Sequence, residues 1–189
     1  MKVIIALTGY SGSGKGKFAK RVERLYGIPT VSTGSVVRAE LARLGLEWTP
    51  ANLNSVSDKL RRQSGNRFCS LIAPAVRKAF LKSDFVIVDS IRESMDLVLL
   101  KTMSDSVETV AILANQRERY RRMRRRRRPA DPATWSEFLK LNRKADKLGM
   151  RKMMDSASHR LENNRSFTAF NRRIDSLMKF IVQKYKKSN

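Results

Sequence analysis

The chain has 189 residues, of which 40 are lysine or arginine and 17 are aspartate or glutamate, so its formal net charge is +23 at pH 7. This length suits one domain with small insertions, no apolar run is long enough to span a bilayer, and no signal peptide precedes the first apolar stretch. The single Cys69 and the lone His159 exclude an intrachain disulfide and a cysteine–histidine metal cluster. We therefore expect a cytoplasmic globular protein whose charge attracts phosphorylated small molecules, RNA or DNA.

The first expected elements are a buried strand, a glycine-rich loop and a helix. Residues 3–7 are all apolar, which predicts a parallel strand covered on both faces. Glycines interrupt this run at positions 9, 12 and 14, and apolar residues resume at helical spacing from Phe18. The pattern Gly-x4-Gly-Lys is complete at Gly9, Gly14 and Lys15, and in this context it is typical of a phosphate-binding loop.

The residue types of this loop suit phosphate binding. Glycine lets several backbone amides point at one anion, a helix N-terminus favours negative charge, and Lys15 supplies a cation for the β- and γ-phosphates. The alternative is a glycine-rich turn that binds nothing. Gly16 stands where a serine or threonine usually ligates magnesium, so that ligand is missing. The residues predicted to cradle the phosphates of ATP are Gly9, Gly12, Ser13, Gly14, Lys15, Gly16 and Lys17.

A second buried strand is expected over residues 84–89, where four apolar residues precede Asp89. A turn and a short strand over 27–32 come first, followed by helices over 32–44, 49–65 and 67–81, the last with a candidate kink at Pro74. Ligands collect where the strands of an open parallel sheet end. Asp89 is therefore the predicted Mg²⁺ ligand, the alternative being an aspartate in an ordinary turn. Arg92 is placed to reach the same cavity.

The rest of the chain continues the alternation of strands and helices. The sequence predicts a helix over 93–103 with Met95, Val98 and Leu99 facing inward, a strand over 107–114, and a very basic helix from Gln116 towards Arg128. A helix resumes from Pro132, no clear strand emerges over 149–164, and an amphipathic helix spans 167–185. This alternation predicts an α/β fold with a parallel sheet covered on both faces.

Four fragments in one order are far more specific than the phosphate loop alone. They read GYSGSGKGKFAK, VSTGSVVRAEL, DFVIVDSIR and RERYRRMRRRRRPADPATWSEF. In order and spacing they resemble archaeal nucleotide-kinase-like proteins related to adenylate kinase and dephospho-coenzyme A kinase, over residues 1–140. The resemblance implies a single three-layer P-loop NTPase domain. Within it, residues 33–82 would form a helical insertion for the acceptor, and residues 117–148 a basic lid.

The same resemblance implies how the acceptor is bound. Thr33, Gly34 and Arg38 match the element that holds an acceptor nucleotide, and the planar fork of Arg38 would pair with its phosphate. The usual aspartate of that element is Ser35 here, which leaves the acceptor open. The family resembled has an Asp-Gly-x-Arg motif at Asp89–Arg92, with Ser90 in place of glycine, and Arg92 would bind the acceptor phosphate or the transferred group.

The lid arginines complete the implied site. Arg119, Arg122 and Arg126 match side chains that fold over ATP, exclude water and neutralise charge during phosphoryl transfer. No general base is demanded, because such catalysis is mostly alignment and cation placement. The predicted catalytic set is Lys15, Asp89, Arg92 and Arg122.

Nine of the twelve residues from Arg117 to Arg128 are arginine, more than a lid needs. They can be a solvated helix face, a kinase lid, or a contact for RNA or DNA, although Tyr120 is the one aromatic side chain within the run. The sequence favours an ATP-dependent phosphotransferase that acts on a nucleotide or nucleotide-like acceptor. The alternatives are an ATP-switched nucleic-acid-binding or ribosome-assembly ATPase on the same fold, and an inactive nucleotide-binding relative.

Overall fold

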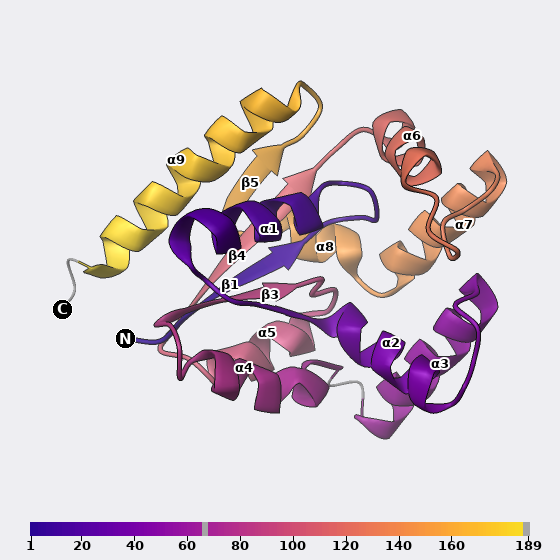
Figure 1. Cartoon of the computed structure of the whole chain (residues 1–189), viewed down its shortest axis with the longest axis horizontal. Helices are drawn as coiled ribbons and strands as arrows, with labels where there is room; N and C mark the ends of the chain where they lie inside the picture. The colour runs from indigo at the N-terminus through magenta and orange to yellow at the C-terminus, as the bar shows by residue number, and fades with distance from the viewer. Residues whose placement is uncertain (66–67, 187–189) are drawn as a thin grey trace.

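The computed structural model describes residues 1–65 and 68–186, and its centre is a parallel sheet of five strands (Figure 1). The strands lie in the order β2-β3-β1-β4-β5. Every residue of β1 is buried, as its continuous apolar run predicts. The registers align Leu7 of β1 and Ser32 of β2 with Asp89 of β3, so three strand ends meet at one edge. The strands span Val3–Thr8 (β1), Thr30–Ser32 (β2), Phe85–Asp89 (β3), Ser106–Leu113 (β4) and His159–Glu162 (β5).

Helices cover both faces of this sheet, which confirms the predicted α/β fold. One face packs on Phe18 and Val22 of α1 and on Ile174 of α9, and the other packs on η1, α4, α5 and α8. None of these helices, among the residues that the structure describes, is long and apolar enough to cross a membrane. They span Lys15–Tyr26 (α1), Thr33–Arg43 (α2), Pro50–Gln63 (α3), Phe68–Ile72 (η1, a 3₁₀ helix), Ala73–Ala79 (α4), Ser94–Lys101 (α5), Gln116–Arg126 (α6), Trp135–Lys147 (α7), Met150–Asp155 (α8) and Phe167–Lys186 (α9).

Two helical pairs flank the loop between β1 and α1 (Figure 1). On one side, α2 and α3 share a small core of their own, with Val37, Leu41 and Val56 buried between them. On the other side, α6 and α7 pack around Phe138, which is fully buried. Both pairs lie towards the ends of the strands, where ligands collect in open α/β sheets. The loop after β1 therefore lies between two small helical units, α2–α3 and α6–α7.

The segment 149–164, for which no clear strand emerged from the sequence, forms α8 and the edge strand β5. β5 pairs in parallel with β4, and His159 aligns with Val110. Leu161 is the one buried residue of its four, so the strand has no apolar run to reveal it. Its conformation comes from backbone pairing with β4, a long-range interaction that local sequence patterns do not record.

The helix expected over 67–81 is divided differently. Its predicted start at Arg67 lies outside the described residues, and a 3₁₀ helix over Phe68–Ile72 precedes α4. Pro74 does not kink a helix, because it lies in the first turn of α4, where its missing N–H costs no hydrogen bond.

The expected inward face of α5 is wrong for Met95 and Val98, whereas Leu99 is partly buried against the core. Met95 and Val98 are 44% and 56% exposed, whereas Asp96 and Leu100 are buried. The helix is turned because the Asp96 carboxylate accepts hydrogen bonds from the backbone N–H of Cys69 (3.1 Å) and of Arg92 (3.4 Å). A buried carboxylate must find such donors, and here they determine which face of a short helix lies inside.

The basic helix α6 ends at Arg126, before the end of the arginine run, and α7 begins at Trp135 rather than near Pro132. Arg127 has φ +47°, a left-handed conformation that stops the helix ahead of Pro129. Thr134 and Glu137 form a capping box that defines the start of α7. A turn of eight residues thus separates the two helices, where the sequence predicts a break of three residues between Arg128 and Pro132.

Glu108 of β4 ties the sheet to α9 through a buried polar cluster. Its carboxylate accepts hydrogen bonds from Lys184 Nζ (2.6 Å) and the Tyr185 hydroxyl (2.6 Å) and lies 2.9 Å from His159 Nε2. Burial by itself would raise the pKa of Glu108, but these hydrogen bonds outweigh it, and the pKa lies below its ordinary value. The ionised carboxylate therefore stabilises the attachment of α9.

We predict that Glu108→Gln lowers the free energy of unfolding by about 1.5–3 kcal/mol at pH 7, the range for hydrogen bonds to charged groups. A depressed folded-state pKa gives stability that is present above the unfolded value of about 4.3 and is lost as pH falls through the folded pKa. Urea titrations should therefore show the difference at pH 7 and its disappearance at more acidic pH. Glu162→Gln, on the exposed face of β5, is the control; an equal loss there would contradict the role of Glu108.

Candidate functional site

The phosphate loop is a tight backbone curl between β1 and α1. Gly9, Gly12 and Gly14 all have positive φ angles, of +139°, +82° and +116°. A Cβ at Gly9 would lie 2.6 Å from the carbonyl oxygen of Ile112, and one at Gly12 would lie 2.7 Å from that of Arg119. Backbone conformation and backbone contacts thus both require glycine, which explains the spacing seen in the sequence.

The loop opens directly into the N-terminus of α1. Gly14 is the N-cap residue of that helix, and no side chain caps it. The helix dipole and the amides of its first turn therefore favour an anion in the loop. Gly16 meets no atom within 4 Å of an added Cβ, so the position after Lys15 borders open space.

Lys15 folds back over the loop in this structure. Its Nζ donates to the carbonyl oxygen of Gly9 at 2.6 Å and more weakly to that of Tyr10 at 3.4 Å. Burial lowers the pKa of Lys15 to about 8, and the charges of Arg92, Arg126 and Arg119 act in the same direction, while Asp89 opposes them. The positive charge of Lys15 is therefore not balanced by nearby negative charge, and a bound phosphate would supply that balance.

Asp89 is the last residue of β3 and Ser90 follows it, at the sheet edge that carries the loop. The Ser90 hydroxyl donates to Asp89 Oδ1 at 3.0 Å and so orients the carboxylate. Ser90 has φ +75°, a left-handed conformation unusual for a residue other than glycine. It occupies the glycine position of the Asp-Gly-x-Arg motif that the sequence resembles, so the backbone there keeps the shape that glycine would allow.

The charges of Asp89 and Arg92 both act on Lys15, so the three side chains belong to the same region of the structure. Burial lowers the pKa of Arg92, the positive charge of Arg61 lowers it further, and Asp89 and Asp96 oppose both. Arg61 itself is paired with Glu93. Asp89 is thus a carboxylate that acts on several cations. Residues 1–65 and 68–186 contain no group of three or more histidine, cysteine, aspartate or glutamate side chains that could hold a metal ion.

The predicted acceptor residues begin at the end of β2. Thr33 Oγ1 donates to the carbonyl oxygen of Ser90 at 3.1 Å and joins α2 to the loop after β3. A Cβ at Gly34 would lie 3.1 Å from NH1 of Arg38, so the guanidinium lies over this glycine. Arg38 is exposed and sits 5.9 Å from the ring of Trp48. The contacts described for Arg38 do not include Lys15, Asp89 or Arg92.

The three predicted lid arginines have different environments. Arg119 is 3% exposed and lies between the rings of Tyr10 (4.6 Å) and Phe138 (5.0 Å), with NH1 donating to Asn142 Oδ1 at 2.8 Å. Burial lowers the pKa of Arg119 to about 10. In this conformation the side chain connects α6, α7 and the loop, which is a structural role.

Arg122 and Arg126 are nearer the loop surface and are also engaged. Arg122 donates to the carbonyl oxygens of Asn163 (2.7 Å) and Ser13 (3.4 Å). Arg126 makes a two-point pair with Asp131, at 2.6 and 2.7 Å. Lys17, which was expected to contact phosphate, lies 3.2 Å from the centre of the Phe167 ring. These cations must leave their present partners before they can contact a ligand.

Asn163, which follows β5, is the site residue that sequence reasoning missed. It is 1% exposed, and its side-chain amide donates to the carbonyl oxygen of Ser13 at 2.7 Å. An added Cβ at Gly14 would collide with the same amide. Nothing in the local sequence marks this asparagine, because its role depends on the pairing of β5 with β4.

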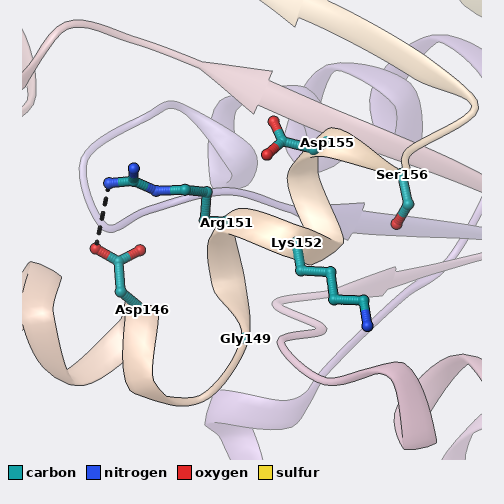
Figure 2. A pocket seen from close by; sticks show the side chains of 6 residues that line it. All are labelled: Asp146, Gly149, Arg151, Lys152, Asp155 and Ser156. Atoms are coloured by element: carbon teal, nitrogen blue, oxygen red, sulfur yellow. Dashed lines mark ion pairs between the residues drawn. The ribbon is translucent and has the colours of Figure 1, made fainter.

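The start of the loop is held from the α7–α8 connection. The Tyr10 hydroxyl donates to Asp146, and the Thr8 hydroxyl approaches the Met150 sulfur at 3.4 Å. Asp146 also borders an open hollow of about 630 Å³ along α8, where it lies 3.9 Å from Arg151 (Figure 2). The carboxylate and the basic side chains of this hollow lie beside the loop rather than in it.

Lys144 of α7 connects the two helical pairs that flank the loop. Its ammonium lies 3.0 Å from Asp58 and 3.1 Å from Asn54, both on α3. An exposed pair of this kind is worth little in stability. It nevertheless links α7, in the proposed lid, to α3, in the proposed acceptor-binding insertion, so it is placed to affect how the site opens.

These features define a P-loop nucleotide-binding protein: a glycine loop before a helix N-terminus, with a lysine and a strand-end aspartate beside it. Residues 8–138 match the family model AAA_17, an AAA domain. The chain belongs to the UPF0200 protein family, since it is 35% identical over 183 residues to a member from Pyrococcus abyssi and 32% identical over 186 residues to one from Pyrococcus horikoshii. These matches cover 95% and 97% of this chain, and 97% and 100% of those relatives.

Solved structures of kinases share the fold at low sequence identity. Shikimate kinase from Bacteroides thetaiotaomicron has a TM-score of 0.61 at 16% identity, covering 95% of this chain and 98% of that one. A sugar kinase from Janibacter has a TM-score of 0.60 at 14% identity, covering 95% of each chain. These similarities confirm the kinase-like P-loop fold, and at such low identity they show no specific activity or substrate.

The comparisons also extend the resemblance noted in the sequence. An archaeal P-loop family is confirmed, but the relation is not confined to residues 1–140, because the Pyrococcus relatives match almost the whole chain. The matched region therefore extends into the C-terminal part of the chain. The finer relation to adenylate kinase and the individual roles of the site residues stay predictions.

We predict that Asn163→Ala loosens the phosphate loop by removing its bond to the Ser13 carbonyl, which is buried with it. Loss of one buried hydrogen bond should cost about 1–3 kcal/mol, measured by thermal unfolding, and should weaken Mg-ATP binding. Asn164→Ala is the neighbouring control, because Asn164 is exposed and contacts the backbone of Asn115 instead. Equal effects of the two changes would contradict the special position of Asn163.

We predict that Mg-ATP binding weakens as pH rises above about 8, with uptake of protons. The free-state pKa of Lys15 is about 8, and phosphate must raise it, so the bound state holds more protons. Calorimetry in buffers of different ionisation enthalpy should show this uptake and a loss of affinity of up to about tenfold per pH unit. Lys15→Arg keeps its charge and should flatten the profile; a flat wild-type profile would contradict the prediction.

Proposed function

We propose that this protein is an ATP-dependent phosphotransferase that acts on a nucleotide or nucleotide-like acceptor. One observation carries the proposal: β1, which leads into the phosphate loop and Lys15, aligns at Leu7 with Asp89 at the end of β3, and the charges of Asp89 and Arg92 act on Lys15. This arrangement combines a phosphate cradle with cations and one carboxylate. Phosphoryl transfer needs such alignment and charge neutralisation more than it needs a general base.

The residues present fit the phosphates of ATP. Ser13 Oγ is buried and has no hydrogen-bond partner among the described residues, so it is a polar atom that a phosphate oxygen would satisfy. Lys15 would exchange the carbonyl oxygens of Gly9 and Tyr10 for phosphate oxygens. The phosphate would then supply the negative charge that balances the Lys15 ammonium.

Asp89 also fits a role in holding Mg²⁺. It is a carboxylate at a strand end beside the phosphate loop, and hard oxygen ligands are those that Mg²⁺ takes. The protein offers no hydroxyl at Gly16, so Asp89 would share the ion with phosphate oxygens and water. A bound Mg²⁺ supplies charge neutralisation at the phosphates. Ser90 would keep the carboxylate oriented for this task.

Arg92 and Arg38 are the residues proposed for the acceptor. Arg92 would bind the transferred group or the acceptor phosphate, while Thr33 and Gly34 shape the entrance to α2. Arg38 is exposed over Gly34 and would turn from Trp48 towards an acceptor phosphate. Ser35 bonds to the Ser32 carbonyl and offers no charge for recognising the rest of the acceptor.

Closure of α6 and α7 would complete the site. Arg122 would leave the carbonyl oxygens of Ser13 and Asn163, and Arg126 would leave Asp131, so that both guanidinium groups reach the phosphates. Arg119 would stay in place and hold α6 to the loop. A closed lid excludes water, which favours transfer over hydrolysis.

The experiment is a transfer assay with Mg-ATP labelled at the γ-phosphate. The acceptor panel holds the nucleoside monophosphates and dephospho-coenzyme A, and shikimate is added because a solved structure of the same fold is named for that substrate. The matched variants are Lys15→Ala in the loop and Lys20→Ala on the exposed side of α1. Each removes one lysine from the same helix.

We predict transfer to one acceptor, lowered by about 10²-fold or more in Lys15→Ala, as for loss of one preorganised transition-state contact. Lys20→Ala should change the rate by less than about twofold, as exposed substitutions away from a site usually do. Transfer that persists undiminished in Lys15→Ala would overturn the proposal. So would binding of ATP without transfer to any member of the panel.

A further inference from the structure

The arginine run is divided between two faces of α6. At 100° per residue, Arg119, Arg122 and Arg126 fall on the side that contacts the phosphate loop or the α6–α7 turn. The opposite side carries Arg117, Arg121, Arg124 and Arg125, all exposed. The phosphotransferase proposal uses the first face and leaves the second without a role.

The turn after α6 extends this outer face. Asp131 pairs with Arg126 and also accepts from the backbone N–H of Arg128 at 3.2 Å, so the turn is held in a defined shape. A hollow of about 720 Å³ lies there, lined by five exposed arginines, by Asp131, and by Met123, Pro132 and Ala133. It is therefore concave, with cations around apolar side chains.

The outer face is almost without counter-charge. Glu118 pairs with Arg121, and Asp131 is occupied by Arg126. Among the residues that the structure describes, the side chains of Arg117, Arg124 and Arg125 have no hydrogen bond or ion pair. Like charges this close repel one another, and a ligand with regularly spaced negative charges would relieve that repulsion.

An aromatic cluster lies along one edge of this face, which the linear sequence does not reveal. The ring of Trp135 stacks on Phe138 with centroids 5.1 Å apart and meets Tyr120 edge-on at 5.3 Å. Trp135 is 39% exposed. The Tyr120 hydroxyl donates to the carbonyl oxygen of Ala133, a residue of the hollow, at 3.1 Å. An exposed indole therefore borders the arginines.

We propose that the outer face of α6 and the turn 127–133 form a binding site for single-stranded RNA. The guanidinium groups contact successive phosphates, and Trp135 stacks on an unpaired base at the rim. A duplex fits less well, because the exposed indole needs a base that is out of its pair. RNA is the polyanion in which unpaired, splayed bases are the ordinary recognition target.

The test measures binding of a fluorescein-labelled 12-nucleotide oligo(U) by anisotropy across a series of salt concentrations. The outer-face variant combines Arg117→Gln, Arg124→Gln and Arg125→Gln. The control variant combines Arg77→Gln, Lys78→Gln and Lys82→Gln, which removes the same charge from exposed residues on and after α4, away from α6 (Figure 1). Thermal unfolding and Mg-ATP binding show that both variants remain folded.

We expect the outer-face variant to bind at least about tenfold more weakly than wild type and to reduce the slope of log K against log salt by about 2, since each phosphate contact on a single strand contributes about 0.7. The control should keep the wild-type slope. Equal losses in both variants would overturn the site, because the binding would then follow net charge alone. Absence of oligo(U) binding, or tighter binding of a 12-base-pair duplex, would also overturn the proposal.

A second measurement tests the stacking contact. The chain has two tryptophans, so Trp48→Phe leaves Trp135 as the single reporter. Oligo(U) should quench its fluorescence with the same midpoint as the anisotropy titration. Unchanged Trp135 fluorescence at saturation would show that no base reaches the aromatic cluster, which would contradict the proposed orientation of the strand.

Discussion

The backbone curl of the phosphate loop is the constraint on which the surrounding structure depends. Three of its residues have positive φ, and the chain segments that touch it leave almost no space for side chains. β4 contacts the loop through Ile112, α6 through Arg119, and the residue after β5 through Asn163. Three segments distant in sequence thus define one loop. Its shape is a property of the whole sheet edge and is not set by the glycine motif alone.

Charge is the second organising feature of the molecule. Arg92, Arg119 and Arg126 all act on Lys15, and Asp89 is the carboxylate that opposes them, so positive charge outweighs negative charge around this lysine. The lowered pKa of Lys15 and its retreat onto backbone carbonyls are the consequences. Binding of a phosphorylated ligand would correct this imbalance. Helix α6 carries further exposed arginines on its outer face, on the side opposite to the arginines that contact the phosphate loop.

The position of α6 connects these two features. One face contacts the carbonyl oxygens of Ser11 and Ser13 through Arg119 and Arg122, and the other presents cations to solvent. A helix that touches the phosphate loop on one side cannot move without moving its outer face. The proposed phosphotransferase and RNA-binding sites therefore share one structural element, although each is tested by itself.

The sequence by itself determined the strand–loop–helix unit and the apolar strands β1, β3 and β4. These follow from local patterns, since continuous apolar runs, glycine spacing and strand-end polar residues are recorded in neighbouring positions. Tertiary structure alone decided the rest. β5 forms by pairing with β4, α5 is turned by the donors that Asp96 finds, Asn163 reaches Ser13 from 150 residues away, and Trp135 comes beside the arginines only because α7 folds back on α6. Each depends on a long-range partner, and single-residue patterns carry no information about such partners.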